Sequence, residues 1–217
     1  MIITVDGPAG AGKGTLAARL AQIYSLDFLD TGLLYRAVAL KMLESGEDFN
    51  DKEAALRAVL LLNSDDLINP SLRNEAIGSG ASIIAVFPEV RSALLAFQRN
   101  FASNPSPGKQ GVILDGRDIG LVILPEAPCK IFVTASPEVR AERRLKELHQ
   151  KKIYSTFELI LEDMEERDTR DRMRKISPLR PAKDAFILDT TGLNLQDVVE
   201  KASFFVDSIY PQAHKNQ

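Results

Sequence analysis

The sequence predicts an α/β protein in which five parallel strands form a doubly wound sheet. Five short apolar segments lack the strict two-residue alternation of strands that have one wet face, so they are expected to be buried. Segments with the apolar spacing of amphipathic helices separate them. A glycine-rich loop joins the first strand to the first helix. Because strand, helix and parallel strand connect in a right-handed sense, ligands are expected at the carboxyl ends of the strands.

The expected strands cover short stretches along the whole chain. They are residues 2–5, 27–29, 111–114, 130–134 and 185–188. Each is expected to be buried on both faces. The first helix repeats Leu16, Leu20 and Ile23, and the second helix stops at Gly46.

Later helices are expected from their capping residues. Asn50 is predicted to cap the third helix, which runs to residue 62, and Ser136 with Pro137 begins a helix after the fourth strand. Ser155 is predicted to cap the next, highly charged helix, and residues 198–209 form the last one. Residues 63–80 contain turn formers with little periodicity and are expected to form an irregular insertion.

Length, composition and charge limit the function. A chain of 217 residues with 45% hydrophobic and 26% charged residues is a typical globular domain. With 27 Lys and Arg against 30 Asp and Glu, the net charge is −3, which provides no global positive field for nucleic acid. The apolar runs are shorter than the roughly 18 residues of a membrane span. The N-terminus lacks a basic signal region, and the lone Cys129 is expected to be a small buried residue, so we expect a cytoplasmic protein.

The loop after the first strand has the G-x-x-x-x-G-K pattern of a phosphate-binding loop. Its residues are Gly7, Pro8, Ala9, Gly10, Ala11, Gly12, Lys13, Gly14 and Thr15. The glycines let successive backbone N–H groups point at phosphate oxygens, and the lysine adds a mobile positive charge. The hydroxyl that usually follows the lysine is replaced by Gly14, and Thr15 stands one place later. Contact of Thr15 with Mg²⁺, direct or through water, is left open.

Two further strand ends carry polar residues. Asp115 follows the third strand, where a carboxylate can hold a water of a Mg²⁺ shell, and Arg117 and Asp118 come next in the loop. Thr31 and Arg36 follow the second strand. Taken singly, they are also explained as a helix cap and a surface charge. The Asn-Lys-x-Asp base reader of a GTP switch does not occur in the chain.

With these motifs the chain resembles the bacterial cytidylate kinases, within the nucleoside monophosphate kinases. The segments that carry the resemblance are residues 6–15, 30–36, 87–91, 115–118 and 166–172. It implies a single P-loop kinase domain over residues 1–217, with a short NMP-binding insertion at about 60–92 and a helical lid at about 150–180. The family usually carries a longer, strand-rich insertion, so the covering of the acceptor is expected to differ here.

The resemblance also implies roles for individual residues. Ser82, Arg91 and Asp118 correspond to the base-facing group, and Arg167 and Asp171 to positions that approach the pentose. The positions that approach the phosphate or the base edge are Arg36, Arg117 and Arg174, and Thr31 is expected among the substrate-binding residues. The expected catalytic residues are Lys13, Arg117, Arg167, Arg170 and Arg174. The implied reaction transfers the γ-phosphoryl group of Mg-ATP to CMP and dCMP in pyrimidine nucleotide metabolism.

The charged segment 162–174 has two interpretations. Its acidic residues precede basic ones by four positions, as in a solvated helix; the pairs are Asp163–Arg167, Glu166–Arg170, Asp168–Arg172 and Asp171–Lys175. At 100° per residue, however, Arg167, Arg170 and Arg174 share one face, which suits phosphoryl oxygens. For Arg140, Arg143 and Arg144 a surface or helix-packing role and contact with ATP are both open. His149 and His214 are expected to be exposed.

The expected protein is a monomeric kinase whose partners are small molecules, ATP and CMP or dCMP, with neither nucleic acid nor membrane. A kinase of another small acceptor, such as UMP or a metabolite hydroxyl, is the alternative enzyme. A nucleotide-sensing module without turnover is the alternative from another class.

Overall fold

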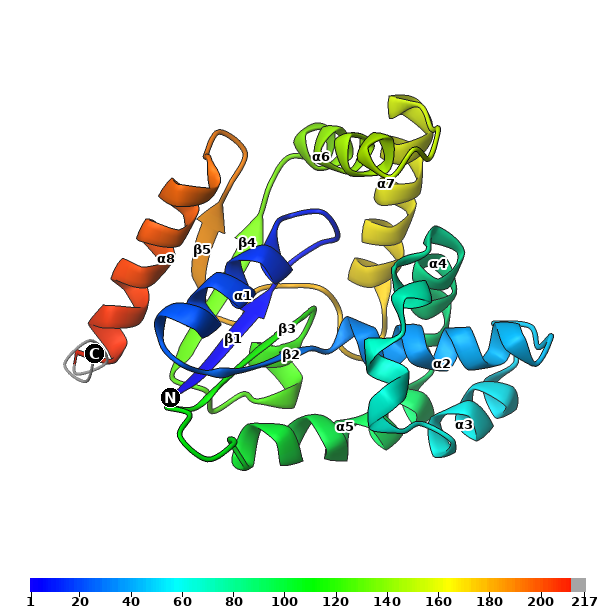
Figure 1. Ribbon diagram of the computed structural model, residues 1–217, viewed down its shortest axis with the longest axis horizontal. Coiled ribbons are helices and arrows are strands. Elements are labelled where there is room, and N and C mark those ends of the chain that lie inside the picture. Colours follow the sequence, from blue (N-terminus) through cyan, green and yellow to red (C-terminus); the bar gives the residue numbers. More distant parts are fainter. Residues whose placement is uncertain (212–217) are drawn as a thin grey trace. The chain divides into compact units, whose positions relative to one another are not determined.

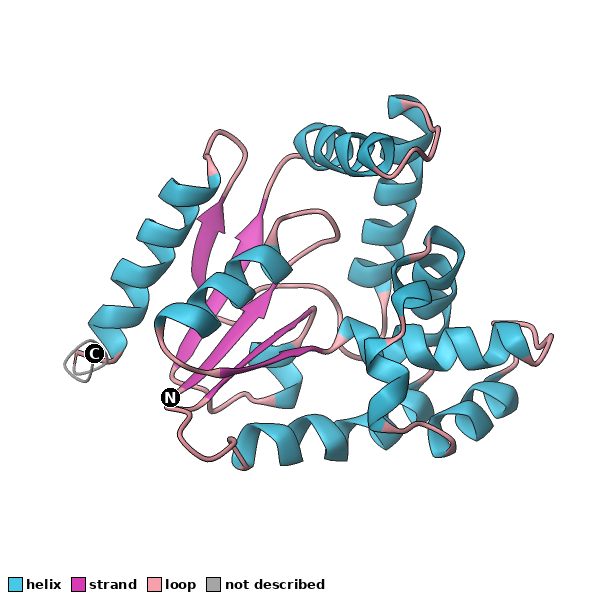
Figure 2. Ribbon diagram, viewed as in Figure 1, coloured by secondary structure: helices cyan, strands magenta, loops and turns pink. Residues whose placement is uncertain are grey.

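The structure, a computed structural model, describes residues 1–211 and divides into two compact units. The first unit contains residues 1–29 and the chain from residue 104 onward, and the second contains residues 30–103. The first holds nearly all of the sheet, and the second consists of helices and short turns (Figures 1 and 2).

The sheet has five strands in the order β2-β3-β1-β4-β5. The strands are β1 (Ile2–Asp6), β2 (Asp27–Asp30), β3 (Val112–Gly116), β4 (Cys129–Thr134) and β5 (Phe186–Asp189). Strand β1 pairs in parallel with β3 and β4, so that Ile3 lies between Ile113 and Cys129. Strand β4 pairs in parallel with β5. All five predicted strands are therefore confirmed, with bounds that differ by one or two residues.

Burial on both faces is confirmed for the central strands and wrong for the edge strands. Every residue of β3 is buried, whereas Phe28 in β2 is 36% exposed and Ile187 in β5 is 50% exposed. In β5, Phe186 stacks on Phe205 of the last helix, with ring centroids 4.8 Å apart. Successive strand residues point to opposite faces, so Ile187 lies on the side that this helix does not cover.

The first unit places helices around this sheet. They are α1 (Lys13–Ile23), α6 (Pro137–Gln150), α7 (Phe157–Met173) and α8 (Leu195–Ile209), together with a π-helical turn, Ile119–Ile123. Leu16 of α1 and Val206 of α8 belong to one apolar core with Ile3 and Ile131 of the sheet. Helices α6 and α7 pack on each other beyond the end of β4 and share a smaller core that includes Met164 (Figure 1).

The second unit is helical. Its helices are α2 (Gly32–Glu44), α3 (Lys52–Leu60), α4 (Glu75–Ile84) and α5 (Pro88–Ser103), with two 3₁₀ turns at Ser64–Ile68 and Pro70–Arg73. Leu34 and Met42 of α2, Ile77 and Ile84 of α4, and Leu94 of α5 form its own apolar core. This unit therefore does not depend on the sheet for its hydrophobic interior.

Two predicted helix caps are wrong, and a third makes no side-chain capping bond. Helix α3 is capped by Asp51, whose carboxylate accepts from the N–H groups of Glu53 and Ala54, because the Asn50 side chain bonds to Asp48 instead. Helix α7 is capped by Thr156 rather than by Ser155. Thr31 occupies the N-cap position of α2, as expected, but its side chain makes no capping bond, and its neighbour Asp30 accepts from the N–H of Gly32 at 3.0 Å. The predictions for Asn50 and Ser155 each missed the cap by one residue, because the next polar side chain accepts from the N–H groups at the start of the helix.

The prediction that residues 63–80 are irregular is wrong for the second half of this segment. Its first half forms the 3₁₀ turns, but α4 begins at Glu75. A Cβ at Gly78 would lie 2.9 Å from the Arg36 guanidinium, and one at Gly80 would lie 2.7 Å from the ring of Phe49. The glycines that lower helix propensity here are thus the residues that let α4 pack against its neighbours.

In the described part of the chain, no single helix is long and apolar enough to cross a membrane, although residues 76–84 and 88–103 meet the criterion together as a pair bent by 100°. Cys129 is buried in β4 and His149 is exposed, as predicted. His214 lies outside the described residues.

Candidate active site

The phosphate-binding loop connects β1 to α1, as predicted. Gly7 has φ +147°, and a Cβ there would lie 2.0 Å from the carbonyl oxygen of Val133 in β4, so only glycine fits. Gly12 adopts the left-handed conformation and precedes the first residue of α1. No acidic residue lies in the first turn of α1 to offset its positive N-terminus. The loop therefore has the backbone and the electrostatics of an anion site.

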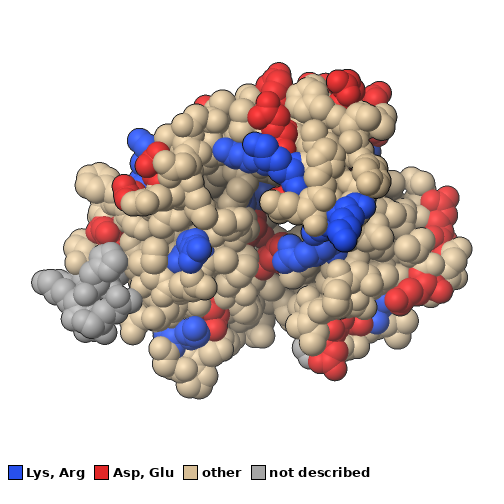
Figure 3. Space-filling view, turned by 45° about the horizontal axis from the view of Figure 1, so that its top comes forward, with Lys and Arg blue, Asp and Glu red and all other residues tan. Residues whose placement is uncertain are grey.

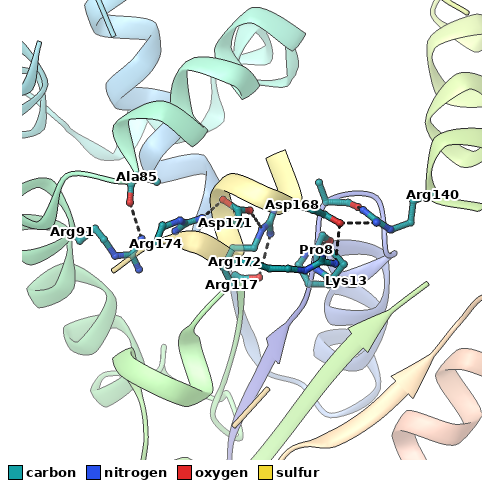
Figure 4. A network of polar contacts seen from close by, with 12 residues as sticks. Pro8, Lys13, Ala85, Arg91, Arg117, Arg140, Asp168, Asp171, Arg172 and Arg174 are labelled. Atoms are coloured by element: carbon teal, nitrogen blue, oxygen red, sulfur yellow. Dashed lines mark hydrogen bonds and ion pairs between the residues drawn. The ribbon is translucent and has the colours of Figure 1, made fainter. Parts of the chain in front are cut away.

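Lys13 is the buried cation of this loop. Its side chain is only 6% exposed, and Nζ donates to the carbonyl oxygen of Pro8 at 2.9 Å (Figure 4). A buried ammonium group keeps much more of its electrostatic strength than one in water. Lys13 is thus held within the loop itself, where a phosphate group would lie.

Two aspartates lie at the carboxyl end of β3 in the same unit: Asp115 is within the strand, not after it as expected, and Asp118 follows it. Asp115 and Asp118 are 6% and 3% exposed. A Cβ at Gly14 would lie 3.2 Å from Oδ2 of Asp115, which places this carboxylate against the phosphate-binding loop. A longer residue at position 14, such as the usual Ser or Thr, would crowd Asp115.

These oxygen donors suit Mg²⁺, which proteins bind through one or two carboxylates together with the phosphates of a nucleotide. Thr15, one position after Gly14, is exposed and carries a hydroxyl oxygen. Among the described residues, no group of three or more His, Cys, Asp or Glu side chains could hold a metal ion by itself. The residues therefore fit a metal ion that shares its ligands with a nucleotide.

Asp6, at the end of β1, was not among the predicted site residues. Its two carboxylate oxygens accept from the N–H groups of Ile119 and Gly120, at 2.7 and 2.8 Å. Burial raises the pKa of Asp6 from 3.8 to about 6; these two hydrogen bonds and Lys13 oppose the shift, and the charge of Asp118 adds to it. Asp6 thus anchors the loop that carries Asp118. The only sequence signal was an acidic residue between an apolar strand and a glycine.

The raised pKa of Asp6 is expected to make the free energy of unfolding depend on pH. Between about pH 4 and 6 the folded protein binds more protons at Asp6 than the unfolded chain does, so this group makes the free energy of unfolding fall as the pH rises. We expect the stability of the wild type, relative to Asp6→Asn, to decrease by up to about 3 kcal/mol from pH 4 to 7. Urea unfolding of both proteins across this range measures it. A difference that does not change with pH would contradict the prediction.

A second charged cluster joins the loop after β3 to the end of α7. Nε of Arg117 donates to Asp171 at 3.1 Å, and Arg174 donates to the other oxygen of the same carboxylate (Figure 4). Burial opposes ionisation of Asp171, but Arg117, Arg174 and Arg167 outweigh it and lower its pKa. Burial also lowers the pKa of Arg167, with a contribution from nearby Arg117. The first unit therefore holds Arg117, Arg167, Asp171 and Arg174 together.

The helical face predicted for the arginines is only partly correct. Helix α7 ends at Met173, and Arg174, with φ −56° and ψ 132°, lies outside the helix; further along, the N–H of Leu179 donates to the Asp171 carbonyl oxygen at 2.8 Å. Arg170 pairs with Glu166 at 2.7 Å, as the solvated-helix interpretation predicted.

The arginines of α6 differ in their contacts, and two of them pack against other segments. Arg143 donates to the backbone and hydroxyl oxygens of Thr190, and Arg144 pairs with Glu147 on the surface. Arg140 is 1% exposed and bonds to Asp168 of α7 and to the backbone of the phosphate-binding loop. Arg140 thus has the helix-packing contact that one interpretation of the sequence expected, but its partner Asp168 was not predicted.

The other predicted acceptor residues lie in the second unit. Thr31 and Ser82 are buried, and Nη1 of Arg36 donates to the carbonyl oxygen of Leu72 at 2.7 Å. Arg91 lies over the ring of Tyr35, 5.7 Å from its centroid, and also donates to the Ala85 carbonyl oxygen (Figure 4). On one face of the described chain, basic and acidic side chains form small separate groups (Figure 3).

A parallel sheet whose first strand leads through a glycine-rich phosphate loop into a helix, combined with a buried lysine and clustered arginines, defines a P-loop kinase. Solved structures share this fold. An uncharacterized protein from Eubacterium ventriosum has a TM-score of 0.56 at 14% identity, covering 96% of this chain and 98% of its own. TT1252 from Thermus thermophilus has a TM-score of 0.51 at 19% identity, covering 96% of both chains.

The sequence comparisons are more specific. The family model for cytidylate kinase matches residues 3–207. Cytidylate kinase from Paramagnetospirillum magneticum is 51% identical over 95% of this chain and 98% of that protein. Cytidylate kinase from Methylocella silvestris is 49% identical over 97% of this chain and 95% of that protein. The chain therefore belongs to the cytidylate kinase family.

Proposed function

We propose that the protein transfers the γ-phosphoryl group of ATP to the 5′-phosphate of CMP and dCMP, giving ADP and CDP or dCDP. The family match over nearly the whole chain supports this reaction. The structural observation that carries it is the presence, in one compact unit, of a phosphate-binding loop and a separate arginine cluster around Asp171. A module that only binds one nucleotide has no need of the second group of cations.

The donor end of the reaction is assigned to the loop of residues 7–15. Its N–H groups are proposed to hold the phosphates of ATP, with Lys13 at the oxygens between the β- and γ-phosphorus atoms. Arg117, Arg167, Arg170 and Arg174 are proposed to neutralise charge on the transferred group. Catalysis then consists of positioning and charge stabilisation. No general base is needed, because the acceptor phosphate is already an anion at neutral pH.

Asp115 and Thr15 are proposed to hold Mg²⁺ together with the ATP phosphates. Their support is the chemistry of the oxygen donors and the position of Asp115 against Gly14. When bound, the metal ion would neutralise part of the phosphate charge.

The remaining predicted site residues are assigned to the acceptor. Ser82, Arg91 and Asp118 are proposed to contact the base, and Arg167 and Asp171 the pentose. Thr31, Arg36, Arg117 and Arg174 are proposed to contact the phosphate or the base edge. Their burial or charge suits polar recognition of a nucleotide. We further propose that residues 60–92 are the NMP-binding insertion and residues 150–180 the lid of a single kinase domain.

The proposal includes the cellular setting. ATP and CMP are small cytoplasmic metabolites, which supports the cytoplasm as the compartment. We propose that the protein is a monomer. Light scattering of the purified protein tests whether it is a monomer.

A coupled assay of ADP release against a panel of nucleoside monophosphates tests the function. We expect CMP and dCMP to be phosphorylated with a kcat/KM well above those for UMP, AMP and GMP. Faster turnover of UMP would favour the alternative acceptor. Tight binding of ATP without ADP release for any acceptor would favour a nucleotide sensor.

A further inference from the structure

A buried ion pair connects α6 to α7 in the first unit. Nη2 of Arg140 lies 2.7 Å from Oδ2 of Asp168, and the two side chains are 1% and 3% exposed (Figure 4). Removing two charges from water is costly, and attraction between them repays the cost only with good geometry and further hydrogen bonds. A buried ion pair therefore need not stabilise the fold, and another role for Arg140 and Asp168 must be considered.

The remaining donors of Arg140 reach two other segments. Nη1 donates to the carbonyl oxygen of Ala9 in the phosphate-binding loop at 3.0 Å, and Nε donates to the carbonyl oxygen of Ala135 after β4 at 3.1 Å. A single rigid guanidinium thus joins the loop, the end of a sheet strand and α7. The packing is equally close, because a Cβ at Gly10 would lie 3.0 Å from Cε of Met164 in α7.

The bond to Ala9 determines how one loop peptide is oriented. In a trans peptide the C=O and the following N–H point in opposite directions. Because the Ala9 carbonyl is directed at Arg140, the N–H of Gly10 is directed away from it. Without Arg140, rotation of this peptide could present the carbonyl oxygen, instead of the N–H, to a phosphate, and two acceptors would then repel each other.

The buried negative charge of Asp168 is compensated mainly by Arg140. Its Oδ1 is buried and has no hydrogen-bond partner. Its other contact, with Arg172, is at 3.4 Å and involves a side chain that is 59% exposed. Since an exposed ion pair contributes little, the Asp168 carboxylate is held mainly by Arg140, next to the apolar core that α6 and α7 share.

We propose that Arg140 is a positioning residue that couples the phosphate-binding loop to α7 through Asp168. The loop conformation that binds the phosphates of ATP then also orients the arginines of α7. This inference rests on the proposed function for the roles of those arginines. The coupling itself is a property of ATP binding and can be measured without an acceptor.

Two variants separate positioning from stability. Asp168→Asn keeps the volume and one acceptor oxygen while removing the charge. The double variant Arg140→Met with Asp168→Leu replaces the ion pair with apolar side chains of similar size, which in other proteins preserves or raises stability. Arg172→Gln is the matched control, because it removes the other, exposed partner of the same carboxylate.

We expect the double variant to fold and to lose at least about thirtyfold in kcat/KM for ATP, since displacement of about 1 Å can cost a hundredfold in rate. In Asp168→Asn, kcat/KM for ATP should fall about tenfold, and in Arg172→Gln it should stay within about twofold of the wild-type value. Each is assayed well below its unfolding temperature. If the pair serves stability alone, a folded double variant will have wild-type kinetics, which would overturn the proposal.

Amide hydrogen exchange provides a readout that does not depend on turnover. We expect the ATP analogue AMP-PNP to slow exchange in α7 of the wild type and to leave it unchanged in the double variant and in Asp168→Asn. If the double variant does not fold, Asp168→Asn decides alone. A wild-type response retained in Asp168→Asn, together with wild-type kinetics, would overturn the coupling. Failure of the wild type to phosphorylate CMP would refute the proposed function but not this exchange result.

Discussion

Lys13→Met is expected to lower kcat by at least about a hundredfold, with a smaller effect on the KM for ATP. Negative charge on the oxygens between the β- and γ-phosphorus atoms increases during transfer, so a cation placed there stabilises the transition state more than bound ATP. Lys13 is 6% exposed and held by the Pro8 carbonyl oxygen within the loop, where little water screens its charge. Methionine retains most of the side-chain length without the charge.

Steady-state kinetics with ATP and CMP measure this effect. Lys146→Met on the exposed side of α6 is the matched control, since it makes the same chemical change outside the loop, and its kinetics should be those of the wild type. An ATP KM that rises greatly at unchanged kcat would contradict the prediction and would assign Lys13 to capture of ATP.

Asp118→Ala is expected to remove most of the preference for CMP over UMP. Cytosine has an amino group at C4, where uracil has a carbonyl oxygen. A carboxylate accepts a hydrogen bond from the first and repels the second. Asp118 is 3% exposed, and a buried acceptor that faces another acceptor leaves both unpaired. The discrimination can reach roughly a thousandfold, so kcat/KM for CMP should fall far more than that for UMP.

The variant Asp118→Asn sharpens this experiment. An amide can turn to donate a hydrogen bond to the uracil oxygen or to accept one from the cytosine amine, so both substrates should be used at similar rates. Thermal unfolding of each variant controls for loss of structure at this buried position. If kcat/KM falls equally for CMP and UMP, the base is read elsewhere, and Ser82 and Arg91 are the next candidates.

Local sequence predicted much of the sheet and the phosphate-binding loop. Short apolar runs that lack alternation indicated strands within a parallel sheet, and all five are present. The loop was predictable because its glycine and lysine pattern is contiguous in the sequence, and Gly7 has a φ of +147° that favours glycine. The pairing of Glu166 with Arg170 followed in the same way from helical spacing.

Helix propensity gave the wrong prediction where packing between helices determines the structure. Gly78 and Gly80 argued against a helix, yet α4 forms because its glycines admit Arg36 and Phe49 and its apolar residues join the core of the second unit. Residues 30–103 form a compact unit of their own, a boundary that no composition change along the chain marks. Contacts between helices outweigh a cost of about 1 kcal/mol for each glycine in a helix.

By itself, the sequence determined the strand order along the chain, the anion-binding loop, the family and the types of charged residue available for chemistry. Only the tertiary structure decided which charges meet. Asp168 has an arginine four residues away on its own helix, but its 2.7 Å partner is Arg140, on α6. Asp6 likewise bonds to backbone more than a hundred residues away in the chain. The physical reason is burial: an exposed pair is governed by local spacing and contributes little, whereas a buried charge needs whichever partner the fold brings into the same dry space.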